Sequence, residues 1–157
     1  MKIIGILLLA LASVCTCATL TSAERKRVWE AEGVYRLLLA IQHGVCEEAK
    51  PLFEIYKDFS CEALEETPFM RALKENGLAY ALKVAPPPLP DTAISSLSLY
   101  AADLGKRFAH EELLSSKKEC EAFRLWLDAY RRELPSRIKI KRTLSLFGGF
   151  ASLLLLI

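Results

Sequence analysis

The pattern of apolar and polar positions is helical along most of the chain. Apolar residues recur at intervals of three and four, which places them on one face of an amphipathic helix. In residues 25–45 these positions are Val34, Leu37, Leu38, Ile41 and Val45. A second helix is predicted from Pro51 to about Glu66, because a proline is best tolerated at the first position of a helix.

Short start and stop signals predict the next two helices. Thr67 followed by Pro68 is typical of a helix start, and Asn76 followed by Gly77 is typical of a helix end. The apolar stretch at residues 78–84 is predicted to add a further short helix. The proline-rich segment at residues 85–90 cannot continue a helix, so we expect it to be a linker between two halves of one domain.

The second half of the domain is predicted to be a helical hairpin. Asp91 is expected to cap its first helix, and Ser116 with Glu119 has the form of a capping box for its last helix, which should end before Pro135. The side chains expected to face one another across this hairpin are Leu97, Leu104, Phe108, Phe123, Leu127 and Tyr130. No stretch alternates at period two. The predicted fold is therefore all-α, a single antiparallel helical bundle of four to five helices within residues 24–136.

The first 23 residues are typical of a targeting segment. Lys2 precedes an apolar run at residues 3–12, and small residues follow up to Ala23. This pattern predicts a secretory signal peptide cleaved after Ala18 or Ala23. The alternative is an uncleaved anchor helix, because apolar character continues to Leu20. The signal reading, which we favour, places the protein in the secretory pathway, extracellular or membrane-associated. Basic residues on the domain side of both apolar segments would instead favour a cytosolic domain with both ends inserted.

Residues 137–157 combine a basic run with an apolar tail. The basic run, Arg137, Lys139, Lys141 and Arg142, leads into the uncharged residues 144–157. As a helix this tail reaches only about 21 Å, which is short of the roughly 30 Å hydrocarbon core of a bilayer. Three readings stay open: a short or tilted transmembrane helix, a signal removed for a lipid anchor, or a last core helix. The cations are predicted to attract a membrane surface.

The distribution of charge excludes one class of partner. Residues 24–128 contain 14 basic and 18 acidic side chains, whereas residues 131–142 contain 6 basic and 1 acidic. A nucleic-acid-binding domain needs a basic surface on its folded body, so we expect no nucleic-acid partner. A membrane and an unknown protein partner are expected instead.

The cysteines allow a disulfide. Removal of the first 23 residues leaves Cys46, Cys61 and Cys120, an odd number in an oxidising compartment. A Cys46–Cys61 bridge would leave Cys120 as a free or intermolecular thiol that could join a homodimer. The alternative is that all three are buried as small apolar residues.

No residue pattern indicates catalysis. Neither His43 nor His110 has the spacing of a metal site, and no glycine-rich loop or Gly-x-Ser-x-Gly turn is present. We therefore predict no catalytic, cofactor-binding or metal-binding residues. Trp29 and Trp126 could anchor a protein partner or lie at the edge of the core.

Three function classes follow from this pattern. The first is a small secreted or membrane-tethered helical protein that acts by protein–protein interaction. The second is a membrane-active or membrane-shaping protein that works through its two apolar ends. The third is an enzyme whose site is not visible in the sequence.

Overall fold

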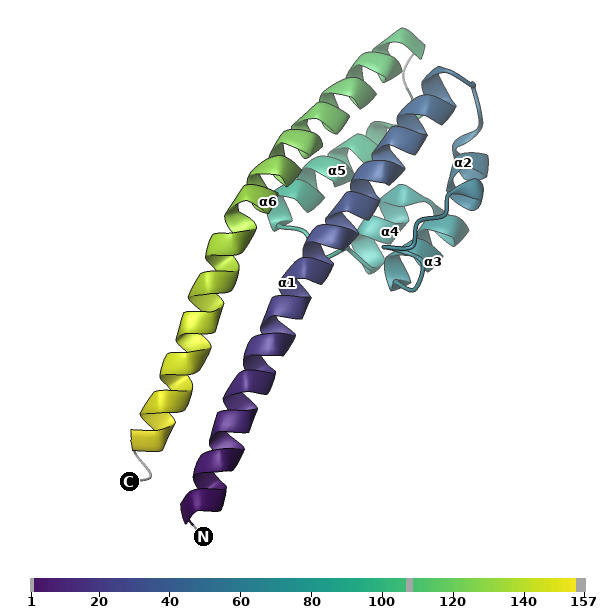
Figure 1. Ribbon diagram of the computed structural model, residues 1–157. Coiled ribbons are helices and arrows are strands. Elements are labelled where there is room, and N and C mark those ends of the chain that lie inside the picture. The colour runs from purple at the N-terminus through teal and green to yellow at the C-terminus, as the bar shows by residue number, and fades with distance from the viewer. Residues whose placement is uncertain (1, 107–108, 155–157) are drawn as a thin grey trace. The chain divides into compact units, whose positions relative to one another are not determined.

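A computed structural model describes residues 2–106 and 109–154 (Figure 1). These residues form six helices and contain no strand, which confirms the all-α prediction. The helices are α1 (Lys2–Cys46), α2 (Leu52–Asp58), α3 (Pro68–Asn76), α4 (Leu78–Val84), α5 (Asp91–Asp103) and α6 (Ala109–Leu154).

The chain divides into two compact units. The terminal unit consists of residues 1–26 and 129–157, and the central unit consists of residues 27–128. The sequence predicted boundaries after residues 23 and 136 instead, and these remain predictions about a mature chain.

The core of the central unit follows the predicted helical stripe of α1. Four side chains of that stripe are almost completely buried: Val34, Leu37, Leu38 and Ile41. They join one apolar cluster with residues of the other helices, including Phe69, Leu73, Leu97, Phe123 and Leu127. Leu97, Leu104, Phe123 and Leu127 are buried as predicted, and the side chain of Phe108 lies outside the described residues.

Helix α3 begins and ends where its sequence signals predict. The side-chain oxygen of Thr67 accepts a hydrogen bond from the backbone N–H of Met70 at 3.3 Å, and Pro68 occupies the first turn. Gly77 ends the helix with a φ of 83°, a conformation that glycine adopts without a steric penalty. The prediction of a separate helix at residues 78–84 is confirmed by α4.

Two predicted helices are shorter in the structure. Helix α2 ends at Asp58, and residues 59–67 form turns that still bury Cys61 and Leu64. Helix α5 ends at Asp103, and the backbone N–H of Leu104 donates the last hydrogen bond of the helix to the carbonyl of Tyr100. The apolar spacing predicted longer helices because buried residues such as Leu64 and Leu104 continue it in the turns beyond the helix ends.

The prediction for the last helix is wrong at both ends. Helix α6 begins seven residues before Ser116, whose side chain is buried inside the helix instead of capping it. It also passes through Pro135 without ending. A proline removes one N–H and crowds one turn. The segment after it pairs with the start of α1, and such tertiary contacts override local preference.

Helix α1 continues through both predicted cleavage positions. Ala18 and Ala23 lie inside one helix that runs on to Cys46. This conformation does not distinguish a signal peptide from an anchor helix, so both stay predictions. Among the described residues, no helix combines the length and the apolar character needed to cross a membrane.

Burial of Tyr56 makes the free energy of unfolding of the central unit fall as the pH rises in the alkaline range. Burial raises the pKa of Tyr56 from 10.0 to about 12, partly offset by a backbone hydrogen bond with Leu78. The folded protein thus keeps Tyr56 neutral where the unfolded chain ionises. This contribution to stability is intact below pH 10 and is lost as the pH rises towards about 12.

We therefore expect Tyr56→Phe to reduce the alkaline loss of stability by about 2 kcal/mol between those two pH values. Urea unfolding of wild type and variant at a series of alkaline pH values measures this difference. The matched control is Tyr80→Phe, because Tyr80 is exposed. Parallel stability profiles for wild type and Tyr56→Phe would contradict the expected role of Tyr56.

Candidate functional site

The terminal unit is a pair of antiparallel helical segments. The first residues of α1 and the last residues of α6 lie at the same end of this unit (Figure 1). The hydroxyl of Ser145 donates a hydrogen bond to the backbone carbonyl of Ser13 at 3.2 Å. Two segments more than a hundred residues apart in sequence are therefore in direct contact.

A buried carboxylate joins the two segments further along. Glu24 is only 2% exposed, and its carboxylate forms an ion pair with the Lys141 ammonium group. The Tyr130 hydroxyl donates a second hydrogen bond to Glu24 at 3.4 Å. A buried charge needs such partners, because an unpaired one would cost several kcal/mol. Lys141, which the sequence assigned to the membrane surface, thus also has a structural role.

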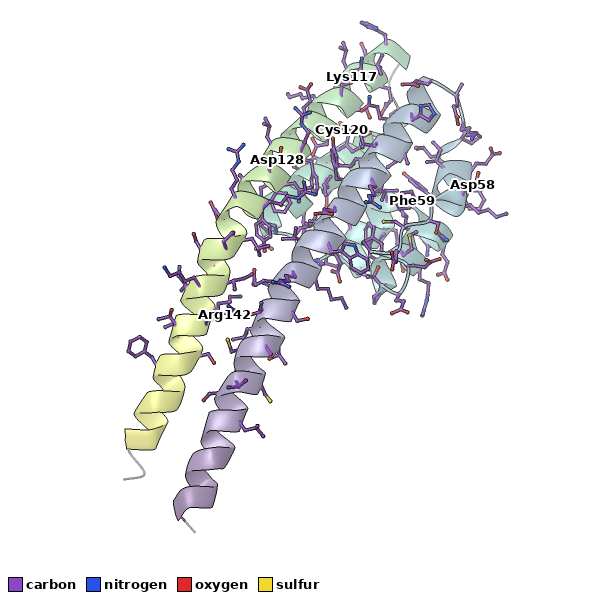
Figure 2. The ribbon with its side chains drawn as sticks, viewed as in Figure 1. Asp58, Phe59, Lys117, Cys120, Asp128 and Arg142 are labelled. Carbon is purple, nitrogen blue, oxygen red and sulfur yellow. The ribbon has the colours of Figure 1, made fainter. Side chains whose placement is uncertain are left out.

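The other members of the basic run are exposed on α6. Arg137 is hydrogen-bonded to Glu133 at 2.9 Å, which raises the pKa of Arg137, and its guanidinium lies 4.8 Å from the centre of the Tyr130 ring. Lys139 and Arg142 are also exposed. Figure 2 labels Arg142 on the part of α6 that pairs with α1. The basic run therefore lies on one helix of the terminal unit, where Arg137 and Lys141 are paired with carboxylates and Lys139 and Arg142 are exposed.

Four large apolar side chains of the terminal unit are exposed towards its chain ends. Leu11 and Val14 on α1 and Leu144 and Phe147 on α6 are between 62% and 70% exposed. Leu11 and Val14 are three positions apart, as are Leu144 and Phe147, so the two members of each pair lie on one face of their helix. We call these four residues the apolar end. Such a group of exposed apolar side chains is typical of a surface that another molecule or a membrane covers.

A groove on the terminal unit contains two further cations. It has a volume of about 560 Å³ and is lined by Val14, Cys17, Ala18, Thr21, Ser22, Arg25 and Arg142. Arg25 lay outside the predicted site because it follows the first apolar segment, far in sequence from the basic run. Its relation to Arg142 depends on the pairing of α1 with α6.

The cysteines of the central unit are in the core. Cys61 and Cys120 are both buried. Cys61 has a free thiol in the structure, and the side chain of Cys46 lies outside the described residues. The Cys46–Cys61 disulfide and an intermolecular bond through Cys120 therefore stay predictions. Burial of Cys120 means that such a bond requires local opening of the core.

The two tryptophans have different environments. Trp126 is half-buried, and its ring lies 5.2 Å from that of Phe123 at an angle of 53°, so it extends the core. Trp29 is more exposed than Trp126. A role as partner anchor stays a prediction for both.

The central unit has a hollow between α5 and α6. It has a volume of about 600 Å³, and its lining includes Leu99, Leu114, Glu111 and Glu119. The Ser96 hydroxyl donates a hydrogen bond to Glu119 across the two helices at 2.8 Å. Leu99 and Leu114 are exposed and lie off the predicted stripes, so the sequence pattern did not single them out.

Three buried polar side chains of the central unit, Tyr100, Glu112 and Ser116, take part in hydrogen bonds. The Tyr100 hydroxyl donates a hydrogen bond to the Ser116 hydroxyl at 3.0 Å, and burial raises the pKa of Tyr100 above its usual range. The Glu112 carboxylate accepts a hydrogen bond from the backbone N–H of Gly105 at 3.3 Å. Ser116 is buried, so it is not accessible as a nucleophile. Within the described residues, no three His, Cys, Asp or Glu side chains are grouped to hold a metal ion.

Comparison of the chain with protein-family models, with curated proteins and with solved structures gave no match. The side chains of the two units are therefore the basis for a functional proposal. The terminal unit is the stronger candidate, because it combines exposed apolar side chains with exposed cations.

Proposed function

We propose that this chain is a membrane-associated helical protein. Its terminal unit binds the membrane surface, and its central unit acts by protein–protein interaction. The observation that carries the proposal is the apolar end, formed by Leu11, Val14, Leu144 and Phe147 on two paired helices, with the basic run further along the same unit.

Insertion of apolar side chains and attraction of cations to anionic lipid together can hold the protein on a membrane without a spanning helix. Complete burial of a Leu, Val or Phe side chain is worth about 1.5–3 kcal/mol. Each Lys or Arg close to an anionic surface adds about 1 kcal/mol. An interfacial helix inserts its apolar face only about 5–10 Å into a bilayer, so the length of the tail is sufficient for this mode.

The proposal requires that residues 1–23 stay attached, which is the uncleaved alternative of the sequence prediction. The hydrogen bond from the Ser145 hydroxyl to the backbone carbonyl of Ser13 supports this alternative, because cleavage after Ala18 or Ala23 would remove Ser13. Loss of residues 1–23 would remove Leu11 and Val14 and leave the other half of the apolar end without its partner helix.

The protein-interaction part of the proposal rests on the central unit. Leu99 and Leu114 line the hollow between α5 and α6 and are exposed to solvent. Exposed apolar side chains that are grouped on a surface can mark a protein interaction site. No feature of the described residues favours an enzymatic function over these two.

Neutralising exposed cations of the terminal unit should weaken binding to anionic vesicles. The variant is Arg132→Gln, Arg137→Gln and Lys139→Gln, which leaves the Glu24–Lys141 ion pair intact. At about 1 kcal/mol for each cation, we expect about a hundredfold loss of affinity at low salt. Flotation of the full chain with vesicles measures the bound fraction. Binding to neutral vesicles should change little, since only the charge term is removed.

The same number of charges can be removed from the central unit as a control. Lys117→Gln, Lys118→Gln and Arg124→Gln change three exposed cations on the same helix. This control should bind like wild type. Equal losses in the two variants would mean that overall charge, and not the terminal unit, attracts the vesicle. The intact mass of the floated protein shows whether residues 1–23 are present in the bound form.

A further inference from the structure

The groove of the terminal unit is lined by two arginines on one side and by small and apolar side chains on the other. Its α1 lining follows helical spacing from Val14 through Cys17 and Ala18 to Arg25, so these residues share one face of the helix. Arg142 of α6 completes the lining. A volume of about 560 Å³ is in the range of sites that enclose a small ligand, about 300–1,000 Å³.

Arg25 and Arg142 bring two positive charges to this groove. Both side chains are exposed, and among the described residues neither forms an ion pair with a carboxylate. The neighbouring cations Arg137 and Lys141 differ, because Glu133 and Glu24 pair with them. Two guanidinium groups beside one groove repel each other unless an anion lies between them.

The geometry of a guanidinium selects the type of anion. Its planar set of N–H donors matches two oxygens of a phosphate group. A phosphate monoester carries a charge of about −1.5 to −2 at neutral pH, which balances two arginines better than a single negative charge does. The Ser22 hydroxyl lies in the same lining and can donate a further hydrogen bond to a phosphate oxygen.

The rest of the groove suits a hydrocarbon chain. Cys17 and Ala18 are small, so they leave space along α1. Val14, which belongs to the apolar end, continues the apolar part of the lining. A ligand that fills the whole groove therefore needs a doubly charged head joined to an apolar chain. A phospholipid with a phosphate monoester headgroup has this composition.

We propose that Arg25 and Arg142 bind the headgroup of a phosphate-monoester phospholipid, with the start of one acyl chain along Val14, Cys17 and Ala18. This inference rests on the proposed membrane association, which it makes selective for one lipid class. The guanidinium groups of Arg25 and Arg142 hold the phosphate, and the other exposed cations of the terminal unit supply the unselective attraction to anionic lipid.

The test compares two vesicle types of equal surface charge, one containing phosphatidic acid and the other phosphatidylserine. We expect the full-length wild type to bind phosphatidic acid vesicles about tenfold more tightly, because two guanidinium groups form charge-assisted hydrogen bonds with the phosphate monoester. Arg25→Gln with Arg142→Gln should abolish this preference while binding to phosphatidylserine vesicles persists. Arg25→Lys with Arg142→Lys keeps the charge and should still lose most of the preference, since the paired donors of arginine are gone.

The matched control removes two cations outside the groove, Arg132→Gln with Lys139→Gln. It should weaken binding to both vesicle types by the same factor and keep the preference. Equal affinity of wild type for the two vesicle types, or a preference that survives Arg25→Gln with Arg142→Gln, would overturn the headgroup site. Absence of binding to any vesicle would instead overturn the membrane function on which the site rests.

A competition with inorganic phosphate separates a lipid from a free anion. If the acyl chain contributes, inorganic phosphate at the concentration of the lipid phosphate should leave the protein on phosphatidic acid vesicles. Release of the protein at that concentration, together with calorimetric binding of phosphate to the lipid-free chain, would contradict the lipid assignment in favour of a site for free phosphate.

Discussion

Phe69→Ala is expected to lower the free energy of unfolding of the central unit by about 3–5 kcal/mol. The Phe69 ring is 2% exposed and lies in the apolar cluster with Leu37, Leu73 and Leu97. Truncation to alanine removes the transfer free energy of the ring and leaves a cavity that the surrounding helices cannot fully close. For a domain of about 100 residues, this loss lowers the melting temperature by more than about 10 °C.

Phe53→Ala is the matched control, because it removes the same ring from a side chain that is 62% exposed. We expect it to change the stability by no more than about 0.5 kcal/mol. Thermal and urea unfolding of the three proteins compare the two positions directly. Similar melting temperatures for wild type and Phe69→Ala would show that the Phe69 ring is not part of the buried apolar cluster.

The sequence was sufficient for the parts of the fold that depend on local signals. Thr67, Pro68 and Gly77 determine the ends of α3 through a cap, a fixed φ and a positive φ. The buried stripe of α1 follows from helical spacing alone. Pro135 and Ser116 were misleading. Ser116 is buried within α6 and accepts a hydrogen bond from Tyr100, and the segment after Pro135 contacts the first part of α1.

The candidate site was only half visible in the sequence for the same reason. The basic run Arg137, Lys139, Lys141 and Arg142 is continuous in the chain and was therefore recognised. Arg25 and Glu24 contribute to the same unit through the pairing of helices about 120 residues apart, which no local pattern encodes. The structural role of Lys141 likewise depends on the burial of Glu24, a property of the folded terminal unit.

Leu144→Asp together with Phe147→Asp should remove most of the affinity for membranes. The change deletes two exposed apolar side chains worth about 1.5–3 kcal/mol each on insertion and adds two negative charges near the lipid. We expect at least a hundredfold loss of affinity for anionic vesicles. The folded central unit should be unaffected, because both positions lie in the terminal unit.

The matched control introduces the same two charges on the central unit, at Leu99 and Leu125. Both leucines are exposed, so Leu99→Asp with Leu125→Asp should keep the fold. This control should lose only the affinity expected from a more negative net charge. An equal loss in both variants would show that net charge dominates and that the apolar end does not insert.

Flotation of full-length wild type and the Leu144→Asp, Phe147→Asp variant on anionic vesicles at high salt tests the membrane function most directly. High salt screens the basic run, so the remaining binding reports the apolar end alone. We predict that a substantial fraction of wild type still floats with the vesicles, whereas the variant stays in the lipid-free fractions. Flotation of both proteins to the same extent, or of neither, would contradict membrane binding through the apolar end.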